Sequence, residues 1–170
     1  MRRIFFVLFA VISFSASAQN TAPVLKFGFL SYDAVLRSMP DYAVVEANME
    51  KLRHQYAAEQ KRVEDEFNKK YEEFLDGQRD FPQTILQKRQ NELQELLDKN
   101  IAFKKESQRL LEQAQKEAMV PLKTRLADAL ARVGSSRGLA FILNTDQNAV
   151  PWMNITMGED VTDAVKAALR

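Results

Sequence analysis

The side chains that could do chemistry in this chain are carboxylates, lysines and one histidine, and their spacing argues against a catalytic site. The only histidine, His54, follows Glu50 by one helical turn, which offers a metal two ligands at most. A catalytic nucleophile needs a base and an orienting group on a rigid scaffold, and no such set stands out. No glycine-rich phosphate loop is present either. We therefore expect a protein that is not an enzyme and that uses no metal, cofactor or ATP.

Apolar side chains in the middle of the chain are more informative. Phe67, Tyr71 and Phe74 follow each other at helical spacing, and their simplest interpretation is a helical seam. Two helices alone cannot fully cover such rings, so we expect part of each ring to face outward and to offer a surface for apolar segments of a partner. The candidate binding residues are Phe67, Tyr71, Phe74, Leu75, Phe81 and Leu86.

These residues lie in a long segment, residues 41–119, that is rich in helix-favouring residues and must break only near residues 76–82. Two helices of roughly 35 residues, each about 50 Å long, would pair as an antiparallel hairpin. The hairpin would form an arm, and we expect its thin far end to be mobile. Apolar positions at heptad-like spacing mark the seam in each helix: Val45, Met49, Leu52, Tyr56, Val63, Phe67, Tyr71 and Phe74, and then Leu86, Leu93, Leu97, Phe103, Leu110, Ala114 and Ala118.

Strands are predicted only near the two ends of the chain, at residues 25–30, 139–143 and 150–155. Asp33 is expected to cap a short helix over residues 34–39 that Pro40 ends, and Asp41 to cap the first long helix. Pro121 is expected to kink or restart the second long helix, which would end at Gly134. A last helix after Asp160 would bury Val161, Ala164, Val165, Ala168 and Leu169.

The predicted fold is mainly α with a small β body: a coiled-coil arm inserted between strands of a small oligomerisation domain, residues 19–40 and 120–170. Such a body has open sheet edges and buries little apolar surface. We therefore expect self-association through apolar strand residues, namely Leu25, Phe27, Phe29, Leu139, Phe141, Ile142 and Leu143.

The first 18 residues are typical of a secretory signal peptide. Arg2 and Arg3 precede an apolar core at residues 4–14, and Ala16-Ser17-Ala18 is a suitable cleavage site. The apolar run is too short to span a bilayer, and without cysteine there is neither a lipid attachment site nor a disulfide. We thus expect an exported protein without a stable membrane anchor. Its near-neutral charge, 24 Lys and Arg against 23 Asp and Glu, also disfavours nucleic acid as a partner.

Several short motifs in this order resemble the Skp (OmpH-like) family of periplasmic chaperones over essentially the whole mature chain. The motifs are Asp33-Ala34-Val35-Leu36, Met39-Pro40-Asp41-Tyr42, Pro121-Leu122, Gly138-Leu139-Ala140-Phe141-Ile142-Leu143 and Glu159-Asp160-Val161-Thr162. The resemblance implies a homotrimer in the periplasm whose strands form a central body. The three hairpins would surround a cavity that holds unfolded outer-membrane proteins.

The prediction is therefore an ATP-independent holdase that binds unfolded outer-membrane proteins and prevents their aggregation. Two other functions stay open. One is a structural or adaptor role in which the coiled arms dock on a single folded partner. The other is a carrier of amphiphiles, with lipid rather than protein between the arms.

Overall fold

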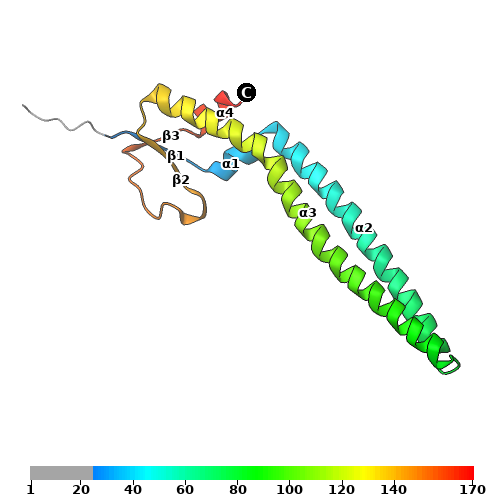
Figure 1. Ribbon diagram of the computed structural model, residues 1–170. Helices are drawn as coiled ribbons and strands as arrows, with labels where there is room; N and C mark the ends of the chain where they lie inside the picture. The colour runs from blue at the N-terminus through cyan, green and yellow to red at the C-terminus, as the bar shows by residue number, and fades with distance from the viewer. Residues whose placement is uncertain (1–24) are drawn as a thin grey trace, which may run out of the picture.

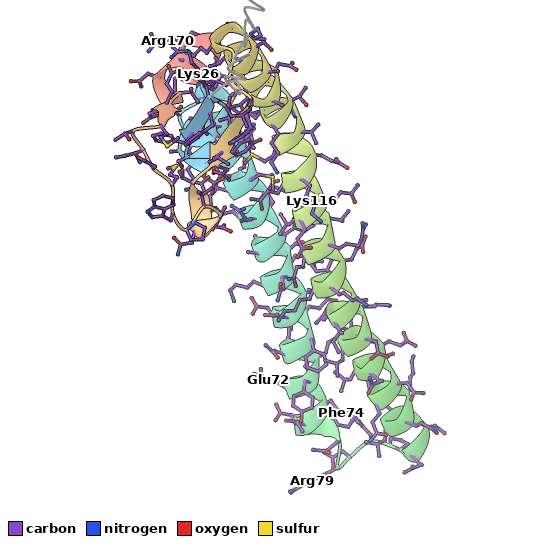
Figure 2. The ribbon with its side chains drawn as sticks, turned by 90° about the vertical axis from the view of Figure 1, so that its left-hand side faces the viewer. Lys26, Glu72, Phe74, Arg79, Lys116 and Arg170 are labelled. Atoms are coloured by element: carbon purple, nitrogen blue, oxygen red, sulfur yellow. The ribbon has the colours of Figure 1, made fainter. Side chains whose placement is uncertain are left out.

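A computed structural model describes residues 25–170, and the predicted signal peptide, residues 1–18, lies outside them. A small body of strands and short helices carries one long helical arm (Figure 1). Lys26 and Arg170 lie at the body end of the molecule and Arg79 at the far end of the arm (Figure 2). The predicted fold class, mainly α with a hairpin inserted between the strands of a small β body, is confirmed.

The arm is an antiparallel pair of helices, α2 (Pro40–Gly77) and the first part of α3 (Gln83–Arg137), joined by a turn at residues 78–82. Met39 is the N-cap of α2 and Pro40 its first residue, a position where a proline costs nothing because the missing N–H would have no partner. The prediction that Asp41 caps this helix is wrong. Asp41 instead lies in the first turn, where its carboxylate pairs with Arg125 of α3.

The helix α3 runs past both residues that were expected to interrupt it. Pro121 lies inside α3, and the helix changes direction where the arm meets the body (Figure 1). A proline inside a helix removes one backbone hydrogen bond and favours such a bend. Gly134 does not end α3. The helix continues to Arg137, and Gly138 terminates it with a left-handed φ of 63°.

The body contains a three-stranded parallel sheet with β1 (Phe27–Leu30) in the centre. One edge is β2 (Phe141–Asn144), in register with β1 from Phe27 opposite Phe141, and the other is β3 (Gly158–Asp160). Parallel neighbours need a long crossover connection, and between β1 and β2 that connection contains the entire arm. The arm is therefore the crossover connection that the parallel pairing of β1 and β2 requires.

The predicted third strand at residues 150–155 is wrong. That segment belongs to a loop, residues 145–157, which contains the short helix η1 (Asp146–Asn148), and the third strand comes later, at β3. Gln147 and Asn148 both have positive φ, 52° and 59°, which no strand accepts, and Pro151 lacks a donor for a ladder. Gly158 is the first residue of β3. Glycine is required there because the Phe27 ring occupies the space that a side chain would need.

Helices α1 (Tyr32–Arg37) and α4 (Thr162–Ala168) close the body. Ser31, not Asp33, caps α1, because its hydroxyl accepts the Ala34 N–H at 3.1 Å. The core joins both short helices to β1 and to the last part of α3. Its most buried members are Leu30, Val35, Met39, Leu122, Leu126, Ala129, Val161 and Val165. The predicted buried side of the last helix is confirmed.

Candidate functional site

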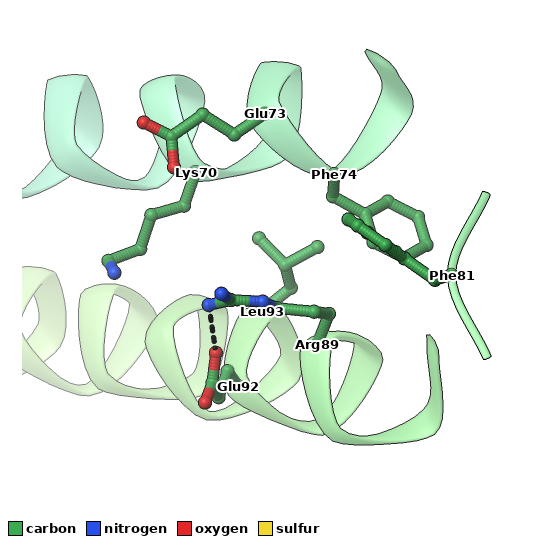
Figure 3. Close-up of a pocket in the computed structure, with 7 residues that line it drawn as sticks. All are labelled: Lys70, Glu73, Phe74, Phe81, Arg89, Glu92 and Leu93. Carbon is green, nitrogen blue, oxygen red and sulfur yellow. Dashed lines mark hydrogen bonds and ion pairs between the residues drawn. The ribbon is translucent and has the colours of Figure 1, made fainter. Parts of the chain in front are cut away.

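The tip of the arm is closed by an apolar cluster of its own. Phe74 points from α2 towards α3, the ring of Phe81 lies beside it, and Leu93 faces both (Figure 3). A side chain at Gly77 would come within 2.5 Å of the Phe81 ring, so the glycine makes room for that ring. Phe74 is only 9% exposed as a result. The expectation that part of each ring would face outward is therefore wrong for Phe74, because the turn contributes a third covering surface.

Charged side chains form the rim of this cluster. Arg89 pairs with Glu92 at 3.0 Å, and Lys70 and Glu73 of α2 stand on the other side of the hollow (Figure 3). Leu86 is half-buried at the start of α3. Of the six candidate binding residues, Phe74, Phe81 and Leu86 thus lie wholly or partly in the interior of the arm and not on its surface.

The other three candidates lie in an exposed strip. The rings of Phe67 and Tyr71 stack with centroids 5.9 Å apart, and Tyr71 and Leu75 are 45% and 43% exposed. From α3, Leu97 and Ile101 reach the same groove as Phe67, and Ile101 is 60% exposed. We call these five residues, Phe67, Tyr71, Leu75, Leu97 and Ile101, the distal strip.

Two members of the distal strip were not recognised from the sequence as surface residues. The heptad-like spacing places Leu97 in the seam and predicts no role for Ile101. The seam of α3 instead passes through Leu96, Asn100 and the buried Ser107. Leu97 and Ile101 are four residues apart and therefore share one helix face, which is the signal that could have identified them.

Polar groups inside the seam fix the alignment of the two helices beneath the strip. The Asn100 side chain donates a hydrogen bond to the Val63 carbonyl at 3.1 Å, 37 residues away in sequence. Closer to the body, the rings of Tyr56 and Phe103 meet with centroids 6.3 Å apart. Such cross-helix contacts hold the strip residues of α2 and α3 in one register.

Most of the remaining arm surface is charged, and several of its charged side chains pair within their own helix. Arg62 binds Glu59 at 2.8 Å and Arg109 binds Glu106 at 2.6 Å, both pairs within one helical turn. These hydrogen bonds lower the pKa of each glutamate and raise the pKa of each arginine. All four side chains are exposed, so the pairs add little stability. Most of the arm surface is therefore charged. The distal strip gathers five apolar residues on it, whereas Val44, Ile85 and Val120 are exposed elsewhere on the two long helices.

The predicted oligomerisation residues divide between two faces of the sheet. Phe27, Phe29, Phe141 and Leu143 alternate with the core-facing positions and occupy the outer face, where the rings of Phe27 and Phe141 stack at 5.7 Å. Phe141 is 47% exposed, and Leu25, just before β1, is also exposed. Leu139 and Ile142 instead pack against the core of their own chain. β2 is an edge strand of the sheet, and Phe141 on its outer face is exposed.

Within residues 25–170, no group of three or more potential metal ligands occurs. His54 and Glu50 approach to 3.2 Å on an exposed helix face. No helix in the same part of the chain is both long enough and apolar enough to cross a bilayer.

The fold and these surfaces define a class of protein: a small β body with a long helical arm, with exposed apolar residues on both the arm and the body. The family model described as Outer membrane protein (OmpH-like) matches residues 26–169. The chain therefore belongs to the OmpH-like family, as the sequence motifs predicted.

A crystal structure from Caulobacter crescentus CB15, described as that of an OmpH-like outer membrane chaperone, has a similar fold. It aligns with a TM-score of 0.66 and 20% sequence identity, over 84% of this chain and 82% of the other. No curated protein matched the chain.

Proposed function

We propose that this protein is an ATP-independent holdase of the periplasm, which binds unfolded outer-membrane proteins and prevents their aggregation. The observation that carries the proposal is the distal strip, a group of five apolar residues on an arm whose surface is mostly charged. Membership of the OmpH-like family supports the same function. Within residues 25–170, no contact buries any member of that strip completely.

A surface of this kind suits a partner without fixed structure. Burial of apolar area contributes roughly 25 cal/mol per Å² and does not depend on a particular sequence. The groove between Phe67 and Ile101 is flanked by Glu64 and Lys104, one charge of each sign, so it favours uncharged segments. Many shallow contacts of this type hold a client and can still be released one at a time.

Three copies joined at their bodies would bring three distal strips around one space. The outer sheet face supplies the apolar surface for such an assembly. A trimer raises the local concentration of binding surface seen by one client, which converts weak contacts into useful affinity. The trimer is part of the proposal, and the solution mass of the mature protein tests it.

The holdase activity is tested by diluting a urea-denatured outer-membrane protein with and without an excess of this protein and following light scattering. We expect suppression by the natural chain and roughly ten-fold weaker suppression by the Leu97→Ser, Ile101→Ser double variant, because about 1.4 kcal/mol of apolar burial is lost. The matched control is Val44→Ser, Val120→Ser, which removes two exposed apolar residues outside the strip.

Unchanged aggregation in the presence of the natural chain would exclude the holdase. If the protein captures one folded partner and has no affinity for denatured outer-membrane proteins, the adaptor role is favoured. Lipid bound to the natively purified protein, detected by mass spectrometry, would favour the amphiphile carrier.

A further inference from the structure

A hollow lies at the root of the arm, where α2 begins beside the bend of α3 (Figure 1). It has a volume of about 440 Å³ and lies between the turn before α2, one face of α3 and the end of α4. Its lining residues are Ser38, Met39, Pro40, Asp41, Arg125, Lys166, Leu169 and Arg170. Pockets that bind small ligands have volumes of about 300–1,000 Å³, so this hollow is large enough to hold one. It shares no residue with the distal strip.

One part of the lining is apolar and is held in place by the core of the body. Met39 is only 3% exposed and belongs to that core, and Leu169 packs against it. Pro40 adds an exposed apolar ring at the first residue of α2. An apolar group that enters the hollow would therefore leave water for a surface that already exists, and little of the protein would have to be ordered for it.

The charged part of the lining is mainly basic. Arg125, Lys166 and Arg170 line the hollow, and Asp41 is the one acidic side chain among its lining residues. The basic side chains exceed the acidic one even when Arg170 is left out of the count. No side chain caps the N-terminus of α2, so the first turn of that helix adds some positive potential. The hollow therefore favours an anion that carries a single charge.

The two central basic residues differ in what they already contact. Arg125 pairs with Asp41 of α2 and donates a hydrogen bond to the Leu169 carbonyl at 3.4 Å, so it joins the arm to the end of α4. Lys166 lies in the last turn of α4 and is half-buried. Within residues 25–170, it takes part in neither ion pair of the body, which are Arg125 with Asp41 and Arg137 with Glu159. Its ammonium group is therefore available to a bound anion.

We propose that this hollow binds an amphiphilic carboxylate. The carboxylate pairs with Lys166, and the apolar group packs on Met39, Pro40 and Leu169. The same chemistry occurs in a free fatty acid and in the C-terminal residue of a polypeptide when that residue is apolar. The inference does not rest on the holdase function, because the hollow and the distal strip are separate surfaces and small molecules test it.

Calorimetric titration of the mature protein tests the carboxylate and identifies its source. The probes are decanoate and N-acetylphenylalanine, each compared with an uncharged counterpart, decanol and N-acetylphenylalanine amide. We expect an acid to bind at least about ten-fold more tightly than its counterpart, because only the acid forms a charge-assisted hydrogen bond with Lys166. Binding of decanoate indicates a fatty acid, and binding of N-acetylphenylalanine indicates a C-terminal residue. Equal affinity of acids and counterparts, or no binding of either acid, would overturn the inference.

Nuclear magnetic resonance of labelled methionine methyl groups locates the ligand. Met39 lines the hollow, whereas Met49 is buried inside the arm. We expect the bound acid to shift the Met39 methyl resonance and to leave that of Met49 in place. The distal strip could also take up an apolar probe, so the titration is repeated with the Leu97→Ser, Ile101→Ser double variant, which should bind the acid normally. Loss of binding in that variant, or an unshifted Met39 resonance, would place the ligand elsewhere and refute the proposal.

Lys166→Gln tests the proposed partner of the carboxylate. We expect this variant to bind the acid about ten-fold more weakly and to bind the uncharged counterpart as the natural chain does, with unchanged helical circular dichroism. Lys166→Arg should restore most of the difference between acid and counterpart, because it keeps the charge. The matched control is Lys123→Gln, which removes an exposed lysine of α3 outside the hollow. Equal affinity of Lys166→Gln and Lys123→Gln for the acid would contradict the site.

Discussion

The tip cluster should determine the stability of the outer arm without affecting that of the body, and Phe74→Ala tests this. Phe74 is almost fully buried between the two helices and the turn. Removal of a ring that buries about 150 Å² at 25 cal/mol per Å² costs up to roughly 4 kcal/mol. A thin hairpin collapses into the gap more easily than a globular core, so we expect about 2–3 kcal/mol.

Hydrogen exchange locates that loss. A destabilisation of 2–3 kcal/mol lowers amide protection about thirty-fold to 150-fold in the segment that opens. We expect this effect in peptides from residues 68–92, with unchanged protection in α4 and in the last turns of α3, because the tip and the body share no core residue. The control is Leu75→Ala, which truncates an exposed neighbour in the same helix and should lower protection far less.

Two outcomes would refute the reasoning. Loss of protection throughout the chain would mean that arm and body unfold as one cooperative unit. Unchanged protection at the tip would mean that Phe74 contributes nothing to closing it, and the outer arm would then owe its order to helix propensity alone.

Two further predictions concern the body. Gly28→Ala should lower the unfolding temperature, because its Cβ would come within 2.9 Å of Leu139 and 3.0 Å of Val161 in the core, an overpacking that typically costs 1–3 kcal/mol; an unchanged melting curve by circular dichroism would contradict it. Hydrogen bonds from the Ser31 hydroxyl, and to a smaller extent from the Asp33 N–H, lower the pKa of Asp146. The stability that the ionised Asp146 contributes is therefore present above the ordinary aspartate pKa of about 3.9, and it is lost as the pH falls through the lowered pKa of the folded protein. Urea unfolding should therefore depend less on pH below about 4 in Asp146→Asn than in the natural chain, and identical pH profiles would contradict the assigned contacts.

The arm could be predicted from the sequence because its signals are repeated many times. Dozens of helix-favouring residues, a heptad-like stripe and one break agree with each other, so no single position decides the result. The strands β1 and β2 were also predicted close to their actual bounds, since each is a short apolar run after a polar segment.

The wrong predictions concern positions where one or two residues determine the local conformation. Asp41 was a good candidate for a cap, but Pro40 beside it starts the helix earlier. Residues 150–155 have the composition of a strand, but positive φ angles just before them direct the chain into a loop. The burial of Phe74 depends on Phe81 folding back over Gly77, a contact across a turn that periodicity does not encode.

The sheet topology explains how the arm and the open sheet face arise from one fold. Because β1 and β2 are parallel, the chain must leave the sheet and return to its starting end, and the arm is that excursion. The loop from β2 to β3 is the second such connection, and it is too short to form a helix that would cover the sheet. One connection therefore extends away from the body and carries the distal strip, while the other leaves the outer sheet face open. In the proposed trimer, the open sheet face would join the three bodies and the arms would surround the space that receives the client.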